Sequence, residues 1–266
     1  MEFETGTIKE WMMDLNISDR RALVTGGSQG IGLGIATALA AEGTEIIIAS
    51  RNSENIERAI VSIRQAYPEA KLAGCAVDLS DEQNIRQKIG GLLSEKPIDI
   101  LINNVGGPPA GPMTTLPLSA WDTGYQGLLR SVLVLTELVL PSMKKRAWGR
   151  LLTITSTAAK ERIPNLPISA TFRAGLSAWT KNLAKEVGRS GILVNNILPG
   201  PIQTGRLDEL EKKSPEFYRS MQEETAIGRI GKPDEVGRVA AFLCSAANTF
   251  VTGTDVFVDG GYTRSY

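Results

Sequence analysis

The chain has 266 residues, with 29 basic and 29 acidic side chains and no histidine, so its formal net charge is zero. The missing histidine excludes a Ser-His-Asp triad, a Cys-His pair and a histidine-bound zinc site, and no metal site is expected. The balanced charge argues against nucleic acid as a partner, the lack of an 18-residue apolar run argues against a membrane span, and two cysteines without CxxC spacing favour a cytoplasmic location.

Apolar runs alternate with helical patterns along the chain. Residues 1–18 are interpreted as an arm over the surface. Strands are predicted at 21–25, 45–50, 71–77, 98–102, 151–155, 192–198 and 255–258. Helices are predicted at 31–41, 53–66, 81–94, 118–146 (with Ser119 as its cap), 170–188 and 233–246, while 206–226 is charged and irregular. Continuous apolar strands are typical of a parallel sheet buried on both faces, so residues 19–266 are predicted to form one doubly wound α/β domain.

A glycine-rich turn joins the first strand to the first helix, in Thr25-Gly-Gly-Ser-Gln-Gly-Ile-Gly32. A turn without side chains lets the backbone approach a pyrophosphate, and the helix N-terminus behind it offers N–H groups and a positive dipole end. The alternative is a glycine-rich turn that binds nothing. The predicted binding residues of the turn are Gly26, Ser28, Gln29, Gly30, Ile31 and Gly32.

Further motifs follow the later strands in order. They are Asp78-Leu79, Asn103-Asn-Val-Gly106, Ser156, Pro199-Gly200, Thr252-Gly253 and Asp259-Gly-Gly261. Together with the glycine turn, this series resembles the short-chain dehydrogenase/reductase family from about residue 20 to 264. The resemblance implies a single-domain Rossmann fold with a doubly wound seven-stranded parallel sheet, assembled as a homodimer or homotetramer.

The end of the second strand indicates which dinucleotide is bound. An acidic residue there suits the ribose 2′-hydroxyl of NAD, whereas an arginine suits the 2′-phosphate of NADP. This chain has Ser50, Arg51 and Asn52 at that place and no acid. The sequence therefore predicts NADP(H), with a surface arginine that binds no ligand as the alternative.

The resemblance also assigns contacts along the rest of the cofactor. Asp78 and Leu79 would meet the adenine, and Asn103 the adenosine ribose. The backbone at Val105 and Gly106 would close over the cofactor. The loop 199–204 would meet the nicotinamide carboxamide, through the residues Pro199, Gly200, Ile202 and Thr204. The alternative interpretations are that Asn103 only caps the end of a strand and that Pro199-Gly200 forms only a turn.

The catalytic positions depart from the family pattern of Asn, Ser, Tyr and Lys. Ser156 matches the serine, but Ser169 stands at the tyrosine position, Arg173 at the lysine position and Leu128 at the asparagine position. Arg173 stays protonated and cannot relay a proton, although it can bind ribose hydroxyls or stabilise an oxyanion. Family members with a similar Ser-xxx-Arg, followed by a stretch such as Val194-Asn-Asn-Ile-Leu-Pro-Gly200, are described as 3-oxoacyl-ACP reductase-like.

The source of the proton stays open. Lys160, four residues after Ser156, and Tyr218, in a segment predicted to form a lid over the substrate at about 201–226, are candidates, as is water. The competing interpretations are a solvated loop lysine and a tyrosine that packs on an amphipathic helix. Residues 107–117 are expected to line the substrate pocket together with the lid.

Three functions are compatible with this pattern. The first is an NADP(H)-dependent reductase of a carbonyl, on a small-molecule or carrier-bound substrate such as a 3-oxoacyl or polyketide-like group. The second is a cofactor-binding protein without dehydrogenase activity, because three of four catalytic residues differ. The third is a non-redox elimination or isomerisation that uses side chains at 160–162. The helix at 118–146 has apolar residues on more than one side, which predicts a partner subunit unless this chain's own sheet covers them.

Overall fold

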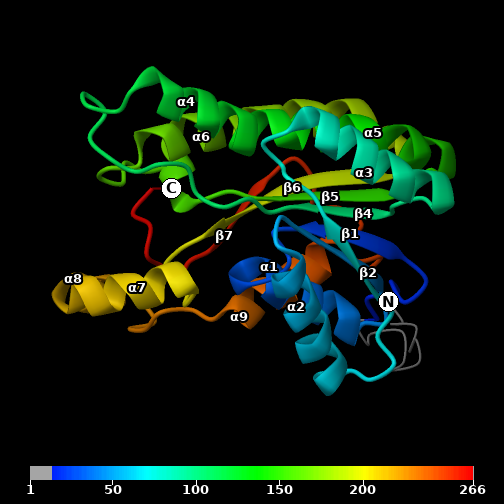
Figure 1. Cartoon of the computed structure of the whole chain (residues 1–266), viewed down its shortest axis with the longest axis horizontal. Coiled ribbons are helices and arrows are strands. Elements are labelled where there is room, and N and C mark those ends of the chain that lie inside the picture. The colour runs from blue at the N-terminus through cyan, green and yellow to red at the C-terminus, as the bar shows by residue number, and fades with distance from the viewer. Residues whose placement is uncertain (1–13, 266) are drawn as a thin grey trace, which may run out of the picture.

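The computed structural model describes residues 14–265. A seven-stranded sheet, parallel throughout, has the strand order β3-β2-β1-β4-β5-β6-β7 (Figure 1). The strands are β1 (Arg21–Thr25), β2 (Glu45–Ser50), β3 (Leu72–Ala76), β4 (Ile100–Asn103), β5 (Gly149–Ile154), β6 (Ile192–Pro199) and β7 (Asp255–Val258). The order reverses between β1 and β4, and at such a switch point a crevice opens beyond the carboxyl ends of the strands.

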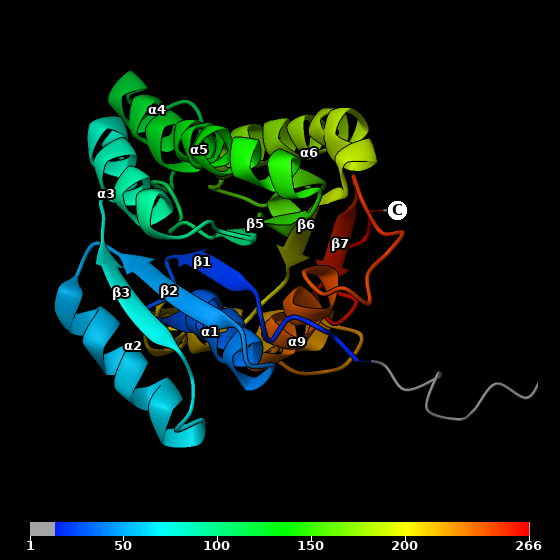
Figure 2. The ribbon, with the colours of Figure 1, turned by 90° about the vertical axis from the view of Figure 1, so that its right-hand side faces the viewer.

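Helices cover both faces of the sheet (Figure 2). They are α1 (Gly30–Ala41), α2 (Ser53–Ala66), α3 (Glu82–Glu95), α4 (Leu118–Gly124), α5 (Ser131–Arg146), α6 (Pro167–Val187), α7 (Gly205–Lys213), α8 (Pro215–Glu224) and α9 (Pro233–Leu243). In Figure 2, α1, α2 and α9 lie on one side and α3 to α6 on the other. The predicted single-domain Rossmann fold is therefore confirmed.

The core consists of two layers because successive residues of a strand point to opposite faces. Ala22 and Val24 of β1 pack with α1 and α9, whereas Leu23 between them packs with α3 and α5. The same alternation holds along β2, β4 and β5. Both faces are apolar, which explains why these strands are continuous hydrophobic runs in the sequence.

Some details of the predicted strands and loops are wrong. The two edge strands are less buried than expected: Ala73, Gly74 and Ala76 of β3 are exposed, and Phe257 of β7 is 36% exposed. The segment predicted to be irregular at 206–226 forms the helices α7 and α8. An edge strand has a neighbour on one side only, and the many charged residues of α7 and α8 obscure their short helical periodicity.

The predicted helix at 118–146 is continuous, but it contains one π-helical turn at Tyr125–Arg130 between α4 and α5. Ser119 is not its cap, because α4 already begins at Leu118 after Pro117. A proline before the first turn sets the backbone entry without a side-chain cap. Leu128, at the position of the family asparagine, lies in the π turn and is 4% exposed.

Of the predicted N-terminal arm, residues 1–13 lie outside the described residues. Its described end packs on the domain. Ile17 is 1% exposed and its carbonyl accepts the Thr44 hydroxyl at 3.0 Å, while the Leu15 carbonyl accepts the Ala246 N–H at 2.9 Å. Within residues 14–265, no helix has the length and apolar character that crossing a bilayer requires.

Candidate functional site

The glycine turn packs tightly against the segment that follows β4. Gly26 and Gly30 have φ of +57° and +54°, a region that favours glycine. The Asn104 side-chain amide donates to the Gly26 carbonyl at 3.2 Å. A Cβ on Gly26 would lie 2.6 Å from the Asn104 carbonyl oxygen, and one on Gly32 would lie 2.1 Å from the Gly26 oxygen. The shape of the turn therefore requires glycine even before any ligand is considered.

Behind the turn, α1 begins without a side-chain cap. Gln29 is its N-cap residue and makes no capping hydrogen bond, and the first turn contains no acidic residue. Backbone N–H groups at such a helix start have no intrahelical acceptor, and together with the helix dipole they suit an anion. Ile31 follows in the first turn of the helix. This arrangement fits a phosphate-bearing ligand.

The end of β2 lies beside this turn. The Ser28 hydroxyl donates to the Ser50 hydroxyl at 3.0 Å, so these two predicted residues are in contact. Arg51 is exposed, and its charge contributes to lowering the pKa of the Asp78 carboxyl, after the hydrogen bonds from Ser80. Asn52 caps α2, because its side chain accepts the Asn55 N–H at 2.9 Å. Arg51 and Asp78 are thus close enough for their charges to interact.

Near the carboxyl end of β4 there is a buried polar atom without a hydrogen-bond partner in residues 14–265 and, three residues later, an open space. Asn103 is 1% exposed, and its side-chain oxygen has no hydrogen-bond partner among the described residues, whereas its amide nitrogen lies 3.5 Å from the Thr153 hydroxyl. A Cβ on Gly106 would meet nothing within 4 Å. An unpartnered buried oxygen and unfilled space next to the glycine turn also fit a bound ligand.

The predicted catalytic residues lie at the carboxyl end of β5 and on α6. Ser156 follows β5, and its hydroxyl oxygen accepts the Ala158 N–H at 3.2 Å. Ser169 and Arg173 lie one turn apart on α6 and are 6% and 7% exposed. The Arg173 guanidinium donates to the Ile154 carbonyl at 2.9 Å and also to the Thr155 carbonyl. Arg173 therefore holds the backbone that leads directly to Ser156.

Lys160 is exposed, but its ammonium is engaged in an ion pair. Its ammonium lies 2.7 Å from the Asp255 carboxylate, whose other oxygen accepts the Asn196 amide at 2.7 Å. Asn196 in turn accepts the Thr180 hydroxyl of α6 at 2.9 Å. Burial alone would raise the pKa of Asp255, but hydrogen bonds from Lys160, Asn196 and Ser177 outweigh it and lower this pKa. Asp255 was not among the predicted site residues, although an acid in an apolar strand was a signal for it.

The loop after β6 reaches the glycine turn. A Cβ on Gly30 would lie 3.2 Å from the Thr204 methyl group, so the two predicted cofactor-binding segments are neighbours. Ile202 is 7% exposed, and a Cβ on Gly200 would clash with Asp259. The loop starts from Pro199, the last residue of β6.

Tyr218 of α8 faces this loop, and not an open space. Its hydroxyl donates to the Gln203 side-chain oxygen at 2.7 Å. Burial, with the nearby Glu211 and Asp208 carboxylates, raises the pKa of Tyr218. The phenol is therefore a weaker acid than usual. Gln203 has a contact role that the sequence analysis missed.

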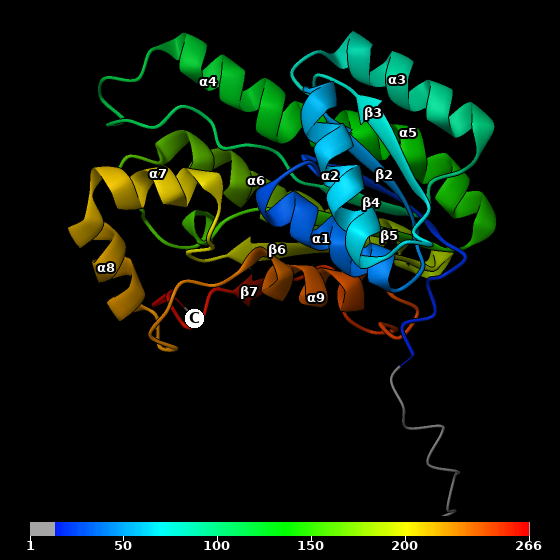
Figure 3. The ribbon, with the colours of Figure 1, turned by 60° about the horizontal axis from the view of Figure 1, so that its bottom comes forward.

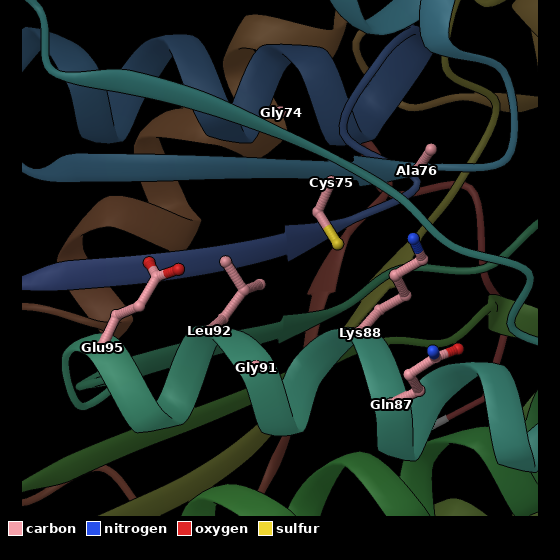
Figure 4. A pocket seen from close by; sticks show the side chains of 8 residues that line it. All are labelled: Gly74, Cys75, Ala76, Gln87, Lys88, Gly91, Leu92 and Glu95. Atoms are coloured by element: carbon pink, nitrogen blue, oxygen red, sulfur yellow. The ribbon is translucent and has the colours of Figure 1, made fainter.

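Two open pockets lie at the surface. One, of about 630 Å³, is lined by Pro112, Met113, the segment 158–165 and residues of α6, so the loop 107–117 meets the segment after Ser156 there, whereas no described residue of 201–226 lines this pocket. The other lies between β3 and α3 around Cys75 and Lys88 (Figure 4). Burial raises the pKa of the Cys75 thiol, which makes it a poor nucleophile, so we assign no chemistry to that pocket.

Comparison with known proteins shows where this architecture belongs. The family model described as enoyl-(acyl carrier protein) reductase matches residues 26–263. The chain belongs to the short-chain dehydrogenase/reductase family. A 3-oxoacyl-[acyl-carrier-protein] reductase of Aquifex aeolicus is 32% identical over 252 residues, which are 94% of this chain and 99% of that protein.

Solved structures of family members agree with the fold. L-sorbose reductase from Gluconobacter frateurii, complexed with NADPH and L-sorbose, has a TM-score of 0.89 and 29% identity and covers 96% of this chain and 100% of its own. A 7α-hydroxysteroid dehydrogenase complexed with NADH has a TM-score of 0.87 and 32% identity, over 93% of this chain and 96% of its own. Family relatives thus bind either dinucleotide.

Proposed function

We propose that the chain is an NADP(H)-dependent oxidoreductase that reduces a carbonyl group on a small-molecule or carrier-bound substrate, such as a 3-oxoacyl or polyketide-like ketone. The observation that carries this proposal is the uncapped, acid-free start of α1 at the same sheet edge as Ser156. Arg51 without a neighbouring acid at the end of β2 supports NADP(H) over NAD(H), because a carboxylate there would repel the 2′-phosphate.

The chain's own residues divide the work as follows. The glycine turn and the first turn of α1 hold the pyrophosphate, Arg51 the 2′-phosphate, Asp78 and Leu79 the adenine, and Ile202 and Thr204 the carboxamide. When bound, the cofactor supplies the hydride that goes to the carbonyl carbon. Ser156 donates a hydrogen bond to the carbonyl oxygen, and the positive charge of Arg173 stabilises the negative charge that develops there.

Water delivers the proton in this proposal. Lys160 is engaged with Asp255, and the Tyr218 hydroxyl with Gln203. Ser169 is a much weaker acid than a tyrosine. The engaged state of Lys160 and Glu161, whose carboxylate accepts the Arg264 N–H at 2.8 Å, also disfavours a non-redox reaction that relies on residues 160–162.

A second candidate function is a cofactor-binding protein without dehydrogenase activity. It is favoured by the contacts of Arg173, whose guanidinium donates to two backbone carbonyls of its own chain. Tight NADPH binding without turnover of any ketone in a broad panel would support this function, and ordinary turnover would remove it.

Titration of the purified ligand-free protein with NADPH and NADH tests the cofactor assignment. Wild type is expected to prefer NADPH, and Arg51→Glu to reverse the preference. Arg58→Glu is the control, since Arg58 is an exposed residue of α2 beyond the β2 end. An unchanged preference in Arg51→Glu would refute the role of Arg51, and no binding of either dinucleotide would refute the reductase.

We also propose that the chain forms a homodimer or homotetramer through the outer side of α4, α5 and α6. Leu128, Val132 and Leu135 are covered within this chain, but Leu129, Leu133 and Leu138 stay partly exposed. Sedimentation at micromolar concentration is expected to show an oligomer, and a monomer would contradict the proposal.

A further inference from the structure

A single side chain links the helices α7 and α8 to the loop after β6. The Gln203 oxygen accepts the Tyr218 hydroxyl of α8 at 2.7 Å, and the Gln203 amide nitrogen donates to the Asp208 carboxylate of α7. The oxygen and the nitrogen of the Gln203 amide thus form hydrogen bonds with two different helices. In Figure 3, α7 and α8 form a pair at one end of the molecule, beside the tip of the sheet.

Backbone hydrogen bonds hold the loop segment that carries Gln203. Its backbone N–H donates to the Gly231 carbonyl at 2.8 Å, and the Gly231 N–H donates to the Pro201 carbonyl at 2.9 Å. Ile202, next to it, is 7% exposed and lies so close to Gly231 that a Cβ there would be 2.6 Å from its side chain. The loop that carries Gln203 therefore does not move easily.

The two helices themselves have little apolar anchorage. Met221 is the one buried side chain recorded in α8, and none is recorded in α7 among the side chains that the structure describes. Phe217 is 54% exposed. Segments with few buried apolar contacts open at low free-energy cost, so a few polar contacts have a large share in holding them.

Gln203 also stands between two residues of the candidate cofactor site. Ile202 precedes it, and Thr204, which neighbours Gly30 of the glycine turn, follows it. We propose that Gln203 is a positioning residue that holds α7 and α8 closed over the nicotinamide end of the cofactor, so that breaking its bonds to Tyr218 and Asp208 speeds cofactor release. This inference rests on the proposed function, and it adds to it the residues that control closure.

The hydroxyl of Tyr218 is suited to this contact. A tyrosine hydroxyl is protonated at neutral pH, and burial raises the pKa of Tyr218 further, so it remains a donor to the Gln203 oxygen. Asp208 supplies an ionised acceptor, and a hydrogen bond to a charged group is stronger than one between neutral groups. The two bonds act on the same amide, so their loss is expected to be non-additive.

Hydrogen exchange of the full-length, ligand-free protein tests the contact without using the cofactor. In Tyr218→Phe, amides of residues 205–224 are expected to exchange about fivefold faster, the effect of losing one hydrogen bond. In Gln203→Leu, which loses the bonds to both Tyr218 and Asp208, exchange should be at least as fast. Exchange in β6 and α9 should stay at the wild-type rate. Asp208→Asn, which keeps an acceptor, should resemble wild type more closely than Asp208→Leu. The control is Tyr67→Phe, which removes another partly exposed hydroxyl remote from this contact. Wild-type exchange in both Tyr218→Phe and Gln203→Leu would overturn the proposal.

Stopped-flow displacement of NADPH then tests whether the closure of α7 and α8 controls cofactor release. The release rate is expected to rise about fivefold in Tyr218→Phe and at least as much in Gln203→Leu, and the double variant should release NADPH no faster than Gln203→Leu. The pH profile of turnover should keep its shape, because Tyr218 donates no proton to substrate. Faster hydrogen exchange at residues 205–224 with an unchanged rate of NADPH release would overturn the proposed link between helix closure and cofactor release. If wild type binds no dinucleotide at all, the proposed function fails, and the exchange data still decide whether Gln203 holds the helices.

Discussion

The ammonium of Lys160 lies 2.7 Å from the carboxylate of Asp255, which joins the segment after β5 to the edge strand β7. The Asp255 side chain is 13% exposed and that of Lys160 is 38% exposed, so this pair is better shielded than an ordinary surface pair. Asn196 and Thr180 extend the contact to β6 and α6. This network therefore fixes the loop that begins at Ser156.

Lys160→Met is expected to destabilise the protein by about 1–2 kcal/mol, because it leaves a largely buried carboxylate without its cation. Urea unfolding measures the change. Lys213→Met is the matched control, since its pair with Glu209 is 3.9 Å long and both side chains are over 70% exposed. The control should change stability by less than about 0.5 kcal/mol. Equal effects of the two variants would contradict this structural role.

The lowered pKa of Asp255 predicts a specific dependence of stability on pH. A carboxyl with a folded-state pKa below its unfolded value stabilises the fold above the unfolded value, and this contribution is lost as the pH falls through the folded one. Wild type should therefore lose stability below about pH 4. Urea unfolding between pH 6 and pH 3 should show a shallower loss in Asp255→Asn. Parallel curves for the two proteins would mean that Asp255 does not titrate differently on folding.

Arg173→Ala is expected to reduce kcat/KM for the best carbonyl substrate by about 100-fold, the usual cost of losing one oxyanion-stabilising group. Lys160→Ala should cost less than about tenfold, because Lys160 does not donate the proton. Circular dichroism and the unfolding midpoint serve to check that both variants fold. Equally small losses would count against the reductase and favour the protein without dehydrogenase activity.

Gly34→Ala tests the close packing of α1 on α9. A Cβ on Gly34 would lie 2.4 Å from the Pro233 carbonyl oxygen, so about 1–3 kcal/mol of destabilisation is expected. Gly90→Ala, in the interior of α3, meets nothing within 4 Å and should stabilise the protein by about 0.5–1 kcal/mol. Thermal unfolding measures whether each variant is less stable or more stable than wild type. A neutral Gly34→Ala would show that the two helices can separate at no cost.

Much of the fold is predictable from the sequence because its signals are local. Runs such as Ile46-Ile-Ile48 and the glycines at 26, 30 and 32 depend on neighbouring residues only, and they locate a buried strand and a tight turn. The same local logic places Ser156 and Asn103 at strand ends. The boundaries were predicted less accurately: Ser119 is not a cap, and two charged helices lie where an irregular segment was predicted.

The sequence by itself determined the sheet, the turn that suits a phosphate and the residue types at the candidate site. Only the tertiary structure decided which side chains meet. Lys160 is paired with Asp255, Tyr218 with Gln203, and Arg173 with the carbonyls before Ser156. Hydrophobic periodicity depends only on the order of residues along the chain, so it can be recognised in the sequence. A hydrogen bond or ion pair requires two groups within a few ångströms of each other. For residues distant in sequence, the packing of the helices and strands sets that distance.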